Sequence, residues 1–467
     1  MEEYDVLVLG SGAGLEFASI AGENNRTVGI VEKESFGGAQ LDAGARSKRL
    51  LYHAEVLETI ERADEFHIDA SVDGFAFEEM VRDVDEELRG NAESLREGVE
   101  ASPFHYLYEG EARFVDERTV EVVGGADDGT RIRADTVILA TGSRPATPDV
   151  EGIESVDYLT SEEALRVETP PDRLVILGSG YISVELGHLF GTFGSDVTFV
   201  CREETLLPEV DEEVAETFTE RYGERFTVHT ATHPTGVSET DGTVTLEATS
   251  GRLDGPEVSA SGDVLLVADG RIPNTAALDL DAAGIETDEH GYVETDEYLR
   301  TTADGVWAVG DVTGNYLLKH SASHEVAAVA RNIYEDERRP VDYSAMPLAV
   351  FASPEVASVG AQEQYLEAGE YATYTEQYES VPRGRAMGAE GFVKAIIDTD
   401  RQVIGCHILG PRASELIQEV VTAMHAGEGT VRNVRRPVHV HPALSEVVQQ
   451  AFSGQFRRTV TDFSRDD

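Results

Sequence analysis

Short apolar runs followed by glycine-rich turns stand out in the first half of the chain. One run covers residues 4–9 and leads into Gly10-Ser11-Gly12-Ala13-Gly14, after which a helical pattern begins near Leu15. A second run at residues 174–177 leads into Gly178-Ser179-Gly180 and repeats this plan. Continuous apolar runs of this length are typical of buried parallel strands. Two units of strand, glycine turn and helix predict two dinucleotide-binding sites in one chain.

The pattern changes toward the C-terminal end. After about Pro340, segments at 391–397 and 403–409 have the pattern of antiparallel strands, and a closing helix begins at Ala413. This order favours a third domain of α+β type. Between the two glycine units, the sequence predicts an acidic helix, two strands and a crossover between domains, at residues 75–100, 119–123, 136–140 and 141–145.

The length and charge of the chain narrow its class. Its 467 residues suggest two or three domains. With 89 Asp and Glu against 37 Lys and Arg, the formal net charge is −52, which disfavours nucleic acid and anionic membranes as partners. One interpretation is an acidic interaction protein. We favour a halophilic cytoplasmic protein, because at molar salt a Debye length of about 3 Å screens the self-repulsion. We therefore expect its dimer and activity to fail in dilute buffer.

Cysteine content and hydropathy add two exclusions. Cys201 and Cys406 lie far apart, each within an apolar run, so neither a disulfide framework nor a cysteine-rich metal site is expected. The Met-Glu-Glu start lacks a basic region, and no apolar run approaches the roughly 20 residues that cross a bilayer. We expect a soluble protein without membrane insertion and without a metal.

The first glycine unit has the residues of a dinucleotide fingerprint. The first glycine of such a motif permits the tight turn and the second lets the backbone approach a pyrophosphate, while an acid about 20 positions later binds the ribose. Gly10, Gly12 and Glu32 meet these requirements. Gly14 belongs to the same cofactor-binding turn, and Leu15 stands at the third glycine position, which predicts looser packing of the helix on the strand.

The second unit differs at the ribose position. Gly178 and Gly180 repeat the turn, but Cys201 stands where an acid usually binds the ribose, and Arg202 follows it. Without the acid, a 2′-phosphate meets no repulsion, and an arginine can bind it in a bidentate way. NADP(H) is therefore favoured over NAD(H) as the nucleotide. The alternative is that Arg202 is an ordinary surface arginine.

Residues 36–48 resemble the active-site helix of the flavoprotein disulfide reductases, a family that includes dihydrolipoyl dehydrogenase and the glutathione, mycothione and mercuric reductases. Gln40 stands at the first redox cysteine, and Ala45 or Gly44 at the second. Neither an amide nor a methyl group can form a thiolate or carry two electrons as a dithiol. The resemblance continues along almost the whole chain, at residues 269–275, 307–311, 351–355 and 441–446.

The resemblance implies that FAD binds at the first unit. Asp311 would then bond the ribityl chain, and Tyr181 would be an aromatic lid over the nicotinamide pocket or, equally well, a core tyrosine. The resemblance also assigns cofactor contacts to Ala112, Thr141, Gly142, Ser143 and Gly270.

The resemblance further implies two catalytic pairs. Lys48 would lie near flavin N5 paired with Glu185, where its positive charge raises the electron affinity of the flavin. His441 would be an acid/base that reaches the flavin of the partner subunit, with its tautomer fixed by Glu446. Without a dithiol, this second pair either has only a structural role or protonates another acceptor.

These observations predict an α/β fold with two Rossmann-like dinucleotide-binding domains and a C-terminal α+β dimerisation domain. The expected boundaries are 1–146 and 271–338 for the FAD domain, 147–270 for the NAD(P)H domain and 339–467 for the dimerisation domain. We expect a homodimer that passes hydride from NADPH through flavin to a small-molecule acceptor other than a disulfide, such as a quinone, an electron carrier or NAD⁺. The alternatives are a non-catalytic flavin-binding or assembly protein, or a dihydrolipoyl dehydrogenase or mycothione reductase in name only.

Overall fold

The first sheet of the computed structural model contains both N-terminal strands and one strand from far along the chain. The structure describes residues 1–38, 41, 44–251, 255–335 and 338–458. Central strand β1 runs parallel to β2 and β6, while β5 joins β6 in the antiparallel sense. The spatial order is β3 (His105–Glu109), β2 (Val28–Glu32), β1 (Glu2–Leu9), β6 (Arg131–Leu139), β5 (Thr119–Val123) and β4 (Glu111–Asp116), with β17 (Val306–Ala308) paired to β6.

The second sheet repeats the parallel plan. Its spatial order is β11 (Thr227–His229), β10 (Asp196–Val200), β9 (Arg173–Leu177), β15 (Val264–Val267) and β8 (Tyr158–Leu159). A separate antiparallel sheet of three strands, which the sequence pattern did not predict, consists of β12 (Thr232–Thr240), β13 (Thr243–Ser250) and β14 (Glu257–Gly262). The first and second sheets are linked by the antiparallel pair β7 (Ser143–Pro145) and β16 (Arg271–Pro273).

The C-terminal sheet is antiparallel, as the sequence predicted. Its spatial order is β18 (Pro347–Val350), β19 (Val356–Gly360), β22 (Val403–Leu409), β21 (Phe392–Asp398), β20 (Tyr371–Gln377) and β23 (Arg457–Arg458). Helix α9 follows β22 and begins at Ala413, where the pattern placed it.

The helices cover the sheets through apolar faces. On α3, the buried residues are Phe77, Val81, Val84 and Leu88, whose spacing of three and four places them on one face. Among the described residues, no helix has both the length and the apolar character that a bilayer crossing requires. The helices are α1 (Ala13–Glu23), α2 (Ala45–Glu61), α3 (Phe77–Ala101), α4 (Ser161–Ala164), α5 (Tyr181–Thr192), α6 (Glu212–Arg225), α7 (Lys319–Tyr334), α8 (Pro382–Met387), α9 (Ala413–His425), α10 (Val431–Arg435) and α11 (Ser445–Ala451).

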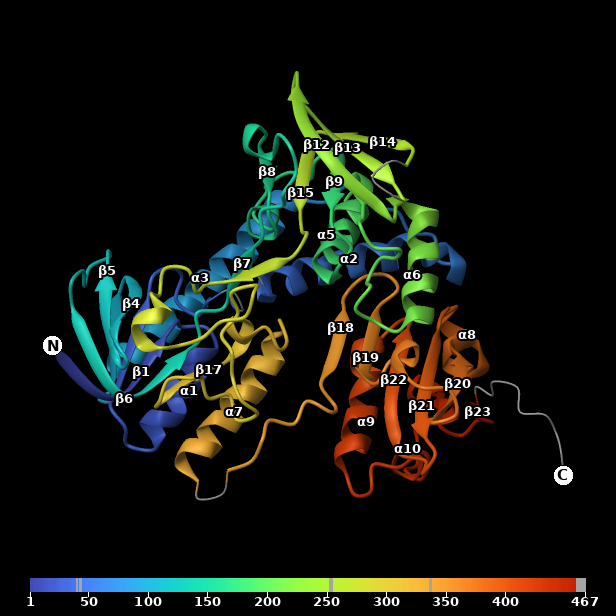
Figure 1. Ribbon diagram of the computed structural model, residues 1–467. Helices are drawn as coiled ribbons and strands as arrows, with labels where there is room; N and C mark the ends of the chain where they lie inside the picture. The colour runs from blue at the N-terminus through green and yellow to red at the C-terminus, as the bar shows by residue number, and fades with distance from the viewer. Residues whose placement is uncertain (39–40, 42–43, 252–254, 336–337, 459–467) are drawn as a thin grey trace.

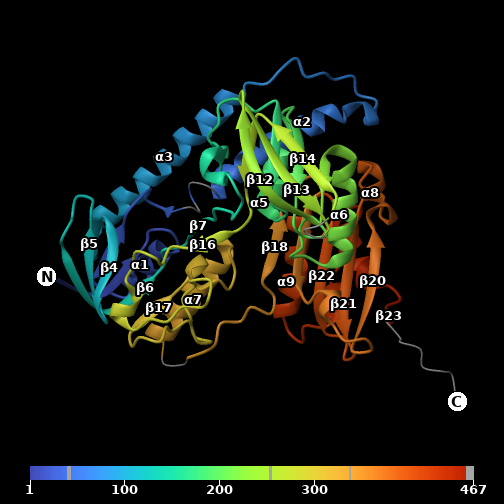
Figure 2. The ribbon, with the colours of Figure 1, turned by 45° about the horizontal axis from the view of Figure 1, so that its top comes forward.

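Three lobes are packed around a shared core. Figures 1 and 2 show the first sheet (blue to cyan) on one side, the C-terminal sheet (orange to red) on the other, and the second sheet (green) above both. One buried cluster contains Leu51 of α2, Val84 of α3, Leu186 of α5, Phe199 of β10 and Phe392 of β21. The lobes therefore meet through apolar side chains rather than through linkers alone.

Two positions near the first turn require glycine, because a side chain there would collide with the backbone or with the sheet. Gly10 has a φ of +99°, and a Cβ there would lie 2.4 Å from the carbonyl oxygen of Ala140. Gly14 allows the closest approach of α1 to the sheet, because a Cβ would lie 2.5 Å from Cγ1 of Val8. The helix is therefore closely packed despite Leu15, and the expectation of looser packing was wrong.

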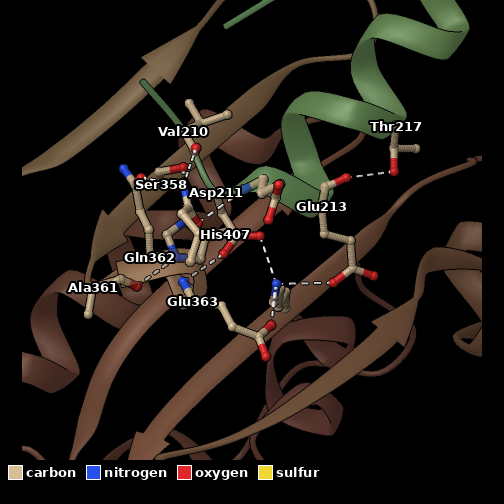
Figure 3. Close-up of polar contacts among 12 residues, drawn as sticks. Val210, Asp211, Glu213, Thr217, Ser358, Ala361, Gln362, Glu363 and His407 are labelled. Carbon is tan, nitrogen blue, oxygen red and sulfur yellow. Dashed lines mark hydrogen bonds and ion pairs between the residues drawn. The ribbon is translucent and has the colours of Figure 1, made fainter. Parts of the chain in front are cut away.

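A buried ion cluster ties the second lobe to the C-terminal sheet. Nζ of Lys394, on β21, lies 2.8 Å from Asp211, 3.2 Å from Glu213 and 2.7 Å from Glu363. Figure 3 shows these three carboxylates converging from the start of α6 and from the segment after β19. Burial opposes the charge, but the hydrogen bonds to Asp211 and Glu363 hold the pKa of Lys394 above its usual value. The sequence pattern alone does not indicate this cluster, because its members are far apart in the chain.

Candidate functional site

A cavity of about 1410 Å³ lies between the first sheet, the start of α2 and the start of α7. It brings together residues from distant parts of the chain that the sequence had assigned to cofactor binding or catalysis. Those that line it are Gly10, Gly12, Glu32, Lys48, Ala112, Thr141, Gly142, Ser143, Tyr181, Glu185 and Asp311. Its lining, as far as the structure describes it, does not include Gly14, Gly178, Gly180, Arg202, Gly270, His441 or Glu446.

The glycine loop and the end of β2 form one end of the cavity. Glu32 accepts hydrogen bonds from the backbone N–H of Ser11 at 2.7 Å and from those of Lys33 and Glu34 at 2.8 Å. Gly38 lies so close to Gly12 that a Cβ on it would be 2.8 Å from the Gly12 Cα. A glycine loop without side chains beside a fixed carboxylate is the arrangement that binds the pyrophosphate and ribose of a dinucleotide.

The cavity lining carries charges of both signs. Three of the chain's four lysines, Lys33, Lys48 and Lys319, line it, together with acidic residues such as Glu32 and Asp311. The cavity walls also contain two buried polar atoms without a hydrogen-bond partner, Oγ1 of Thr141 and Nε2 of His324. Buried polar atoms are nearly always paired, so these atoms need a partner that the protein itself does not supply. The residues present therefore fit a polar group such as a flavin dinucleotide.

Lys48 and Glu185 form the ion pair that the resemblance implied. Nζ of Lys48 lies 2.6 Å from Oε2 of Glu185, whose side chain is only 4% exposed. The second oxygen, Oε1, accepts from the Phe351 N–H at 3.1 Å, and the ammonium lies 5.2 Å from the centre of the Phe351 ring. Glu185 is thus fixed by a backbone donor and in turn orients the lysine into the cavity.

Asp311 is held by a short chain of donors. The Ser143 hydroxyl donates to Oδ2 of Asp311 at 2.6 Å, and Nε of Arg271 donates to that hydroxyl oxygen at 2.7 Å. Arg271 was not among the predicted site residues, although it stands in the recognised segment 269–275.

The Tyr181 hydroxyl donates to the carbonyl oxygen of Leu317 at 3.2 Å, and burial raises the pKa of Tyr181 to about 12. Its ring therefore closes against the segment before α7.

Glu325 is a second residue that the sequence analysis missed. It is 0% exposed, and its two oxygens accept from the Gly310 N–H and the Tyr343 hydroxyl, each at 2.6 Å. Burial raises the pKa of Glu325 to about 7, although both hydrogen bonds oppose the shift. The sequence signal for its burial is that Glu325 follows the small buried residues Ser321 and Ala322 by four and three positions, which places it on the same face of α7.

We expect Glu325 to make stability depend on pH. Because the pKa rises from 4.5 to about 7 on folding, the folded state binds more protons than the unfolded state between these values. The free energy of unfolding should then fall as pH rises through this window, by at most about 1.4 kcal/mol per pH unit. Denaturant unfolding of the parent and of Glu325→Gln measures this, since the variant should lack that contribution. Identical pH slopes in the two proteins would contradict the assignment.

The second glycine unit has the predicted turn, but its arginine, Arg202, is already paired with a carboxylate. Gly178 has a φ of +134°, and Nη2 of Arg202 donates to Asp269 at 2.9 Å. Cys201 is fully buried, its thiol donates to the Gly178 carbonyl at 3.4 Å, and burial raises its pKa to about 12. Gly270 has a φ of +119°, with no atom within 4 Å of the position of a Cβ. Arg202 is therefore an ion-pair partner in this structure, not an uncommitted phosphate ligand.

The histidine pair lies on the C-terminal lobe. Nδ1 of His441 and Oε1 of Glu446 are 2.9 Å apart, and the other Glu446 oxygen accepts from the Ala443 N–H at 3.1 Å. The hydrogen bond from His441 lowers the pKa of Glu446. The His441 side chain is 68% exposed, and its neighbours Val438 and Val440 are 99% and 73% exposed. The two residues are in contact with each other, but neither lines the described cavity of this subunit.

Neither of the chain's two cysteines lines the described cavity. Gln40 lies outside the described residues, whereas Gly44 and Ala45, at the start of α2, line the cavity. The chain's two cysteines, Cys201 and Cys406, are fully buried, and burial raises the pKa of both thiols. Neither is positioned to act as a thiolate in the described cavity.

Comparisons with known proteins agree over nearly the whole length. A family model described as pyridine nucleotide-disulphide oxidoreductase matches residues 4–331, and the model of its dimerisation domain matches residues 346–452. A mycothione reductase of Mycobacterium tuberculosis is 35% identical, covering 97% of this chain and 100% of the relative. Dihydrolipoyl dehydrogenase 3 of Haloarcula marismortui is 34% identical, covering 96% of this chain and 95% of the relative.

One solved structure has the same architecture at lower identity. The Cu(II) complex of the HOCl-induced flavoprotein disulfide reductase RclA from Escherichia coli has a TM-score of 0.85 and 25% identity. The match covers 97% of this chain and 99% of that one.

Proposed function

The chain belongs to the pyridine nucleotide-disulphide oxidoreductase family and carries that family's dimerisation domain, and on this premise we propose that it is a homodimeric, FAD-dependent NAD(P)H oxidoreductase whose acceptor is not a disulfide. A quinone, a small electron carrier or NAD⁺ would take the electrons. We further propose that it works in the cytoplasm of a cell with high internal salt, as its net charge of −52 suggests.

One observation carries the proposal. The cavity retains the glycine loop, Glu32 and the Lys48–Glu185 pair, while both of the chain's cysteines are buried elsewhere. A disulfide reductase needs a thiolate to attack its substrate. Hydride transfer to a flavin needs only a nicotinamide held against the ring. The retained parts therefore support the second activity and not the first.

Separate residues of the chain would bind the cofactor, place charge beside it and supply a proton. Glu32 would hold the adenosine ribose, Gly10 and Gly12 would admit the pyrophosphate, and Asp311 would bond the ribityl chain. Bound FAD would supply the capacity to accept hydride from NAD(P)H and pass it on. Lys48, oriented by Glu185 at 2.6 Å, would place positive charge beside the reacting ring. In the homodimer, His441 would supply a proton to the acceptor at the partner subunit's site, with Glu446 fixing its tautomer.

Anaerobic reduction tests this proposal. Flavin-loaded protein mixed with NADPH or NADH should show bleaching of the flavin absorbance, without a long-wavelength thiolate-to-flavin band, since no thiolate borders the ring. Lys48→Met should slow bleaching, because it removes the charge that stabilises the reduced flavin. A long-wavelength band abolished by thiol alkylation would contradict the proposal. Absence of bleaching with both nucleotides would favour the alternative, a flavin-binding protein without catalytic activity.

The nucleotide preference depends on Arg202 and its partner. We propose NADPH as the donor, with Arg202 exchanging Asp269 for the 2′-phosphate when the nucleotide binds. Arg202→Ala should then weaken NADPH binding by roughly 1.5–3 kcal/mol and leave NADH nearly unchanged. Asp269→Asn should strengthen NADPH binding selectively, because it releases the arginine. Titration of both nucleotides into the three proteins measures this, and equal changes for NADH and NADPH would mean that Arg202 does not bind the phosphate.

A further inference from the structure

Hydrogen-bond donors of the second dinucleotide unit are bound to carboxylates of the chain itself. The Tyr181 N–H, at the N-terminus of α5, donates to Oε1 of Glu209 at 3.2 Å. The Ser179 hydroxyl, within the glycine loop, donates to Glu203 at 2.7 Å. With Arg202 held by Asp269, three of the donors around this turn each have an acidic partner. Donors that would bind the phosphates or ribose of a nucleotide thus have internal acceptors.

Glu209 takes the position where a pyrophosphate would approach. In such a unit the second glycine lets the backbone come close to the pyrophosphate, which sits at the helix N-terminus. Above Gly180, the nearest atom to the position of a Cβ is Oε1 of Glu209, at 3.9 Å. At the first unit, the corresponding atom above Gly12 is the Gly38 Cα at 4.0 Å, which belongs to uncharged backbone. The two units therefore differ in the group that lies above the second glycine, which is a carboxylate in the second unit and backbone in the first.

The backbone of Glu209 is anchored by the C-terminal lobe. The Gln362 amide donates to the Glu209 carbonyl at 2.7 Å, and the Gln364 amide donates to the Val210 carbonyl at 3.1 Å. The next residue, Asp211, belongs to the buried ion cluster, and Figure 3 shows Val210, Asp211 and Gln362 side by side. The side chain of Glu209 remains exposed at its outer side. A fixed backbone with an exposed carboxylate can release the helix terminus by rotating its side chain alone.

We propose that the Glu209 side chain occupies the pyrophosphate position of the second unit. A pyridine nucleotide must displace this side chain in order to bind, and Glu209 therefore lowers the affinity for the nucleotide. The inference rests on the proposed function, because it presupposes that a pyridine nucleotide binds here. Glu203 adds to the effect, since its charge lies on the same loop and repels the phosphates. The chain thus lowers its own nucleotide affinity by competition within the subunit.

Nucleotide titration of matched variants tests the proposal. Flavin-loaded parent, Glu209→Gln, Glu203→Gln and the control Glu204→Gln are titrated calorimetrically with NADP⁺, which cannot reduce the flavin, and with ADP-ribose at one salt concentration. Glu204 is exposed on the same loop, so its variant removes an equal charge without freeing the helix. Glu209→Gln should bind both probes about three- to tenfold more tightly, the range expected for a carboxylate at an exposed helix terminus. Glu204→Gln should change affinity by less than about twofold.

The outcomes separate the two proposals. Equal affinity of the parent and Glu209→Gln for both probes, with clear binding by each, would overturn the competition while leaving the proposed function intact. An equal gain in Glu204→Gln would also overturn it, because general charge and not occupancy would then be the cause. Absence of binding by any of the four proteins would overturn the proposed function and this inference with it. Gln362→Ala, which frees the Glu209 backbone, should give a smaller gain than Glu209→Gln.

Discussion

The purified, flavin-loaded protein should reduce lipoamide, glutathione disulfide and mycothione at least about 10³-fold more slowly than it reduces a quinone or dye with the same nucleotide. Loss of a catalytic nucleophile typically lowers turnover by several orders of magnitude. Here Gln40 and either Ala45 or Gly44 stand where the resemblance places the redox dithiol, and Cys201 and Cys406 are buried with raised thiol pKa values. Steady-state assays with each acceptor measure the ratio. Comparable rates with disulfides would refute the assignment of a non-disulfide acceptor.

Restoring the cysteines separates chemistry from geometry. Gln40→Cys combined with Ala45→Cys recreates the pair in one alignment, and Gln40→Cys combined with Gly44→Cys recreates it in the other. If the scaffold is otherwise a disulfide reductase, one of the two double variants should gain disulfide reduction and a thiolate-to-flavin band. Single variants at Ala45 or Gly44 serve as controls, because one thiol cannot form the intramolecular disulfide.

The second large effect concerns stability. Lys394→Met should lower the free energy of unfolding by about 3–5 kcal/mol, because removing one partner of a buried ion pair leaves an uncompensated charge. Lys394 is 3% exposed and Asp211 is 0% exposed, so neither carboxylate nor ammonium can be rehydrated in the folded state. Denaturant unfolding at neutral pH and constant salt measures the loss.

A matched control uses another lysine. Lys33 pairs with Glu111 at 3.2 Å, but its side chain is 42% exposed. Lys33→Met should therefore change the free energy of unfolding by no more than about 1 kcal/mol. Losses of similar size in the two variants would show that net charge, and not burial of the cluster, determines the effect.

Local sequence patterns predicted the parts of the site that depend on short segments. The two glycine turns follow from motifs with fixed spacing. The pairs Lys48–Glu185 and His441–Glu446 were implied by the family resemblance, and the structure places each pair in contact. The partner of Arg202 is 67 residues away in the chain. Motif spacing contains no information on which distant loops meet, so this ion pair could not be predicted.

The same reason explains the other omissions. Glu209 and Lys394 look like ordinary charged residues in the sequence, and their roles arise from packing of the second lobe against the C-terminal sheet. Glu325 was hidden because an acid within a helical pattern normally faces solvent. The fold class was easier to predict, because strand and helix periodicity repeats over many residues and single errors are averaged out.

The distribution of lysines makes this protein selectively accessible to chemical labelling. Lys33, Lys48 and Lys319 border the cavity with side chains 42%, 39% and 44% exposed, whereas the Lys394 side chain is 4% exposed. An amine-reactive reagent will therefore modify the cavity rim and the terminal amine, and leave the acidic outer surface untouched. A fluorophore or crosslinker attached in this way would report directly on occupation of the cavity. In proteins whose lysines are spread over the surface, labelling of a single site requires substitution of the other lysines.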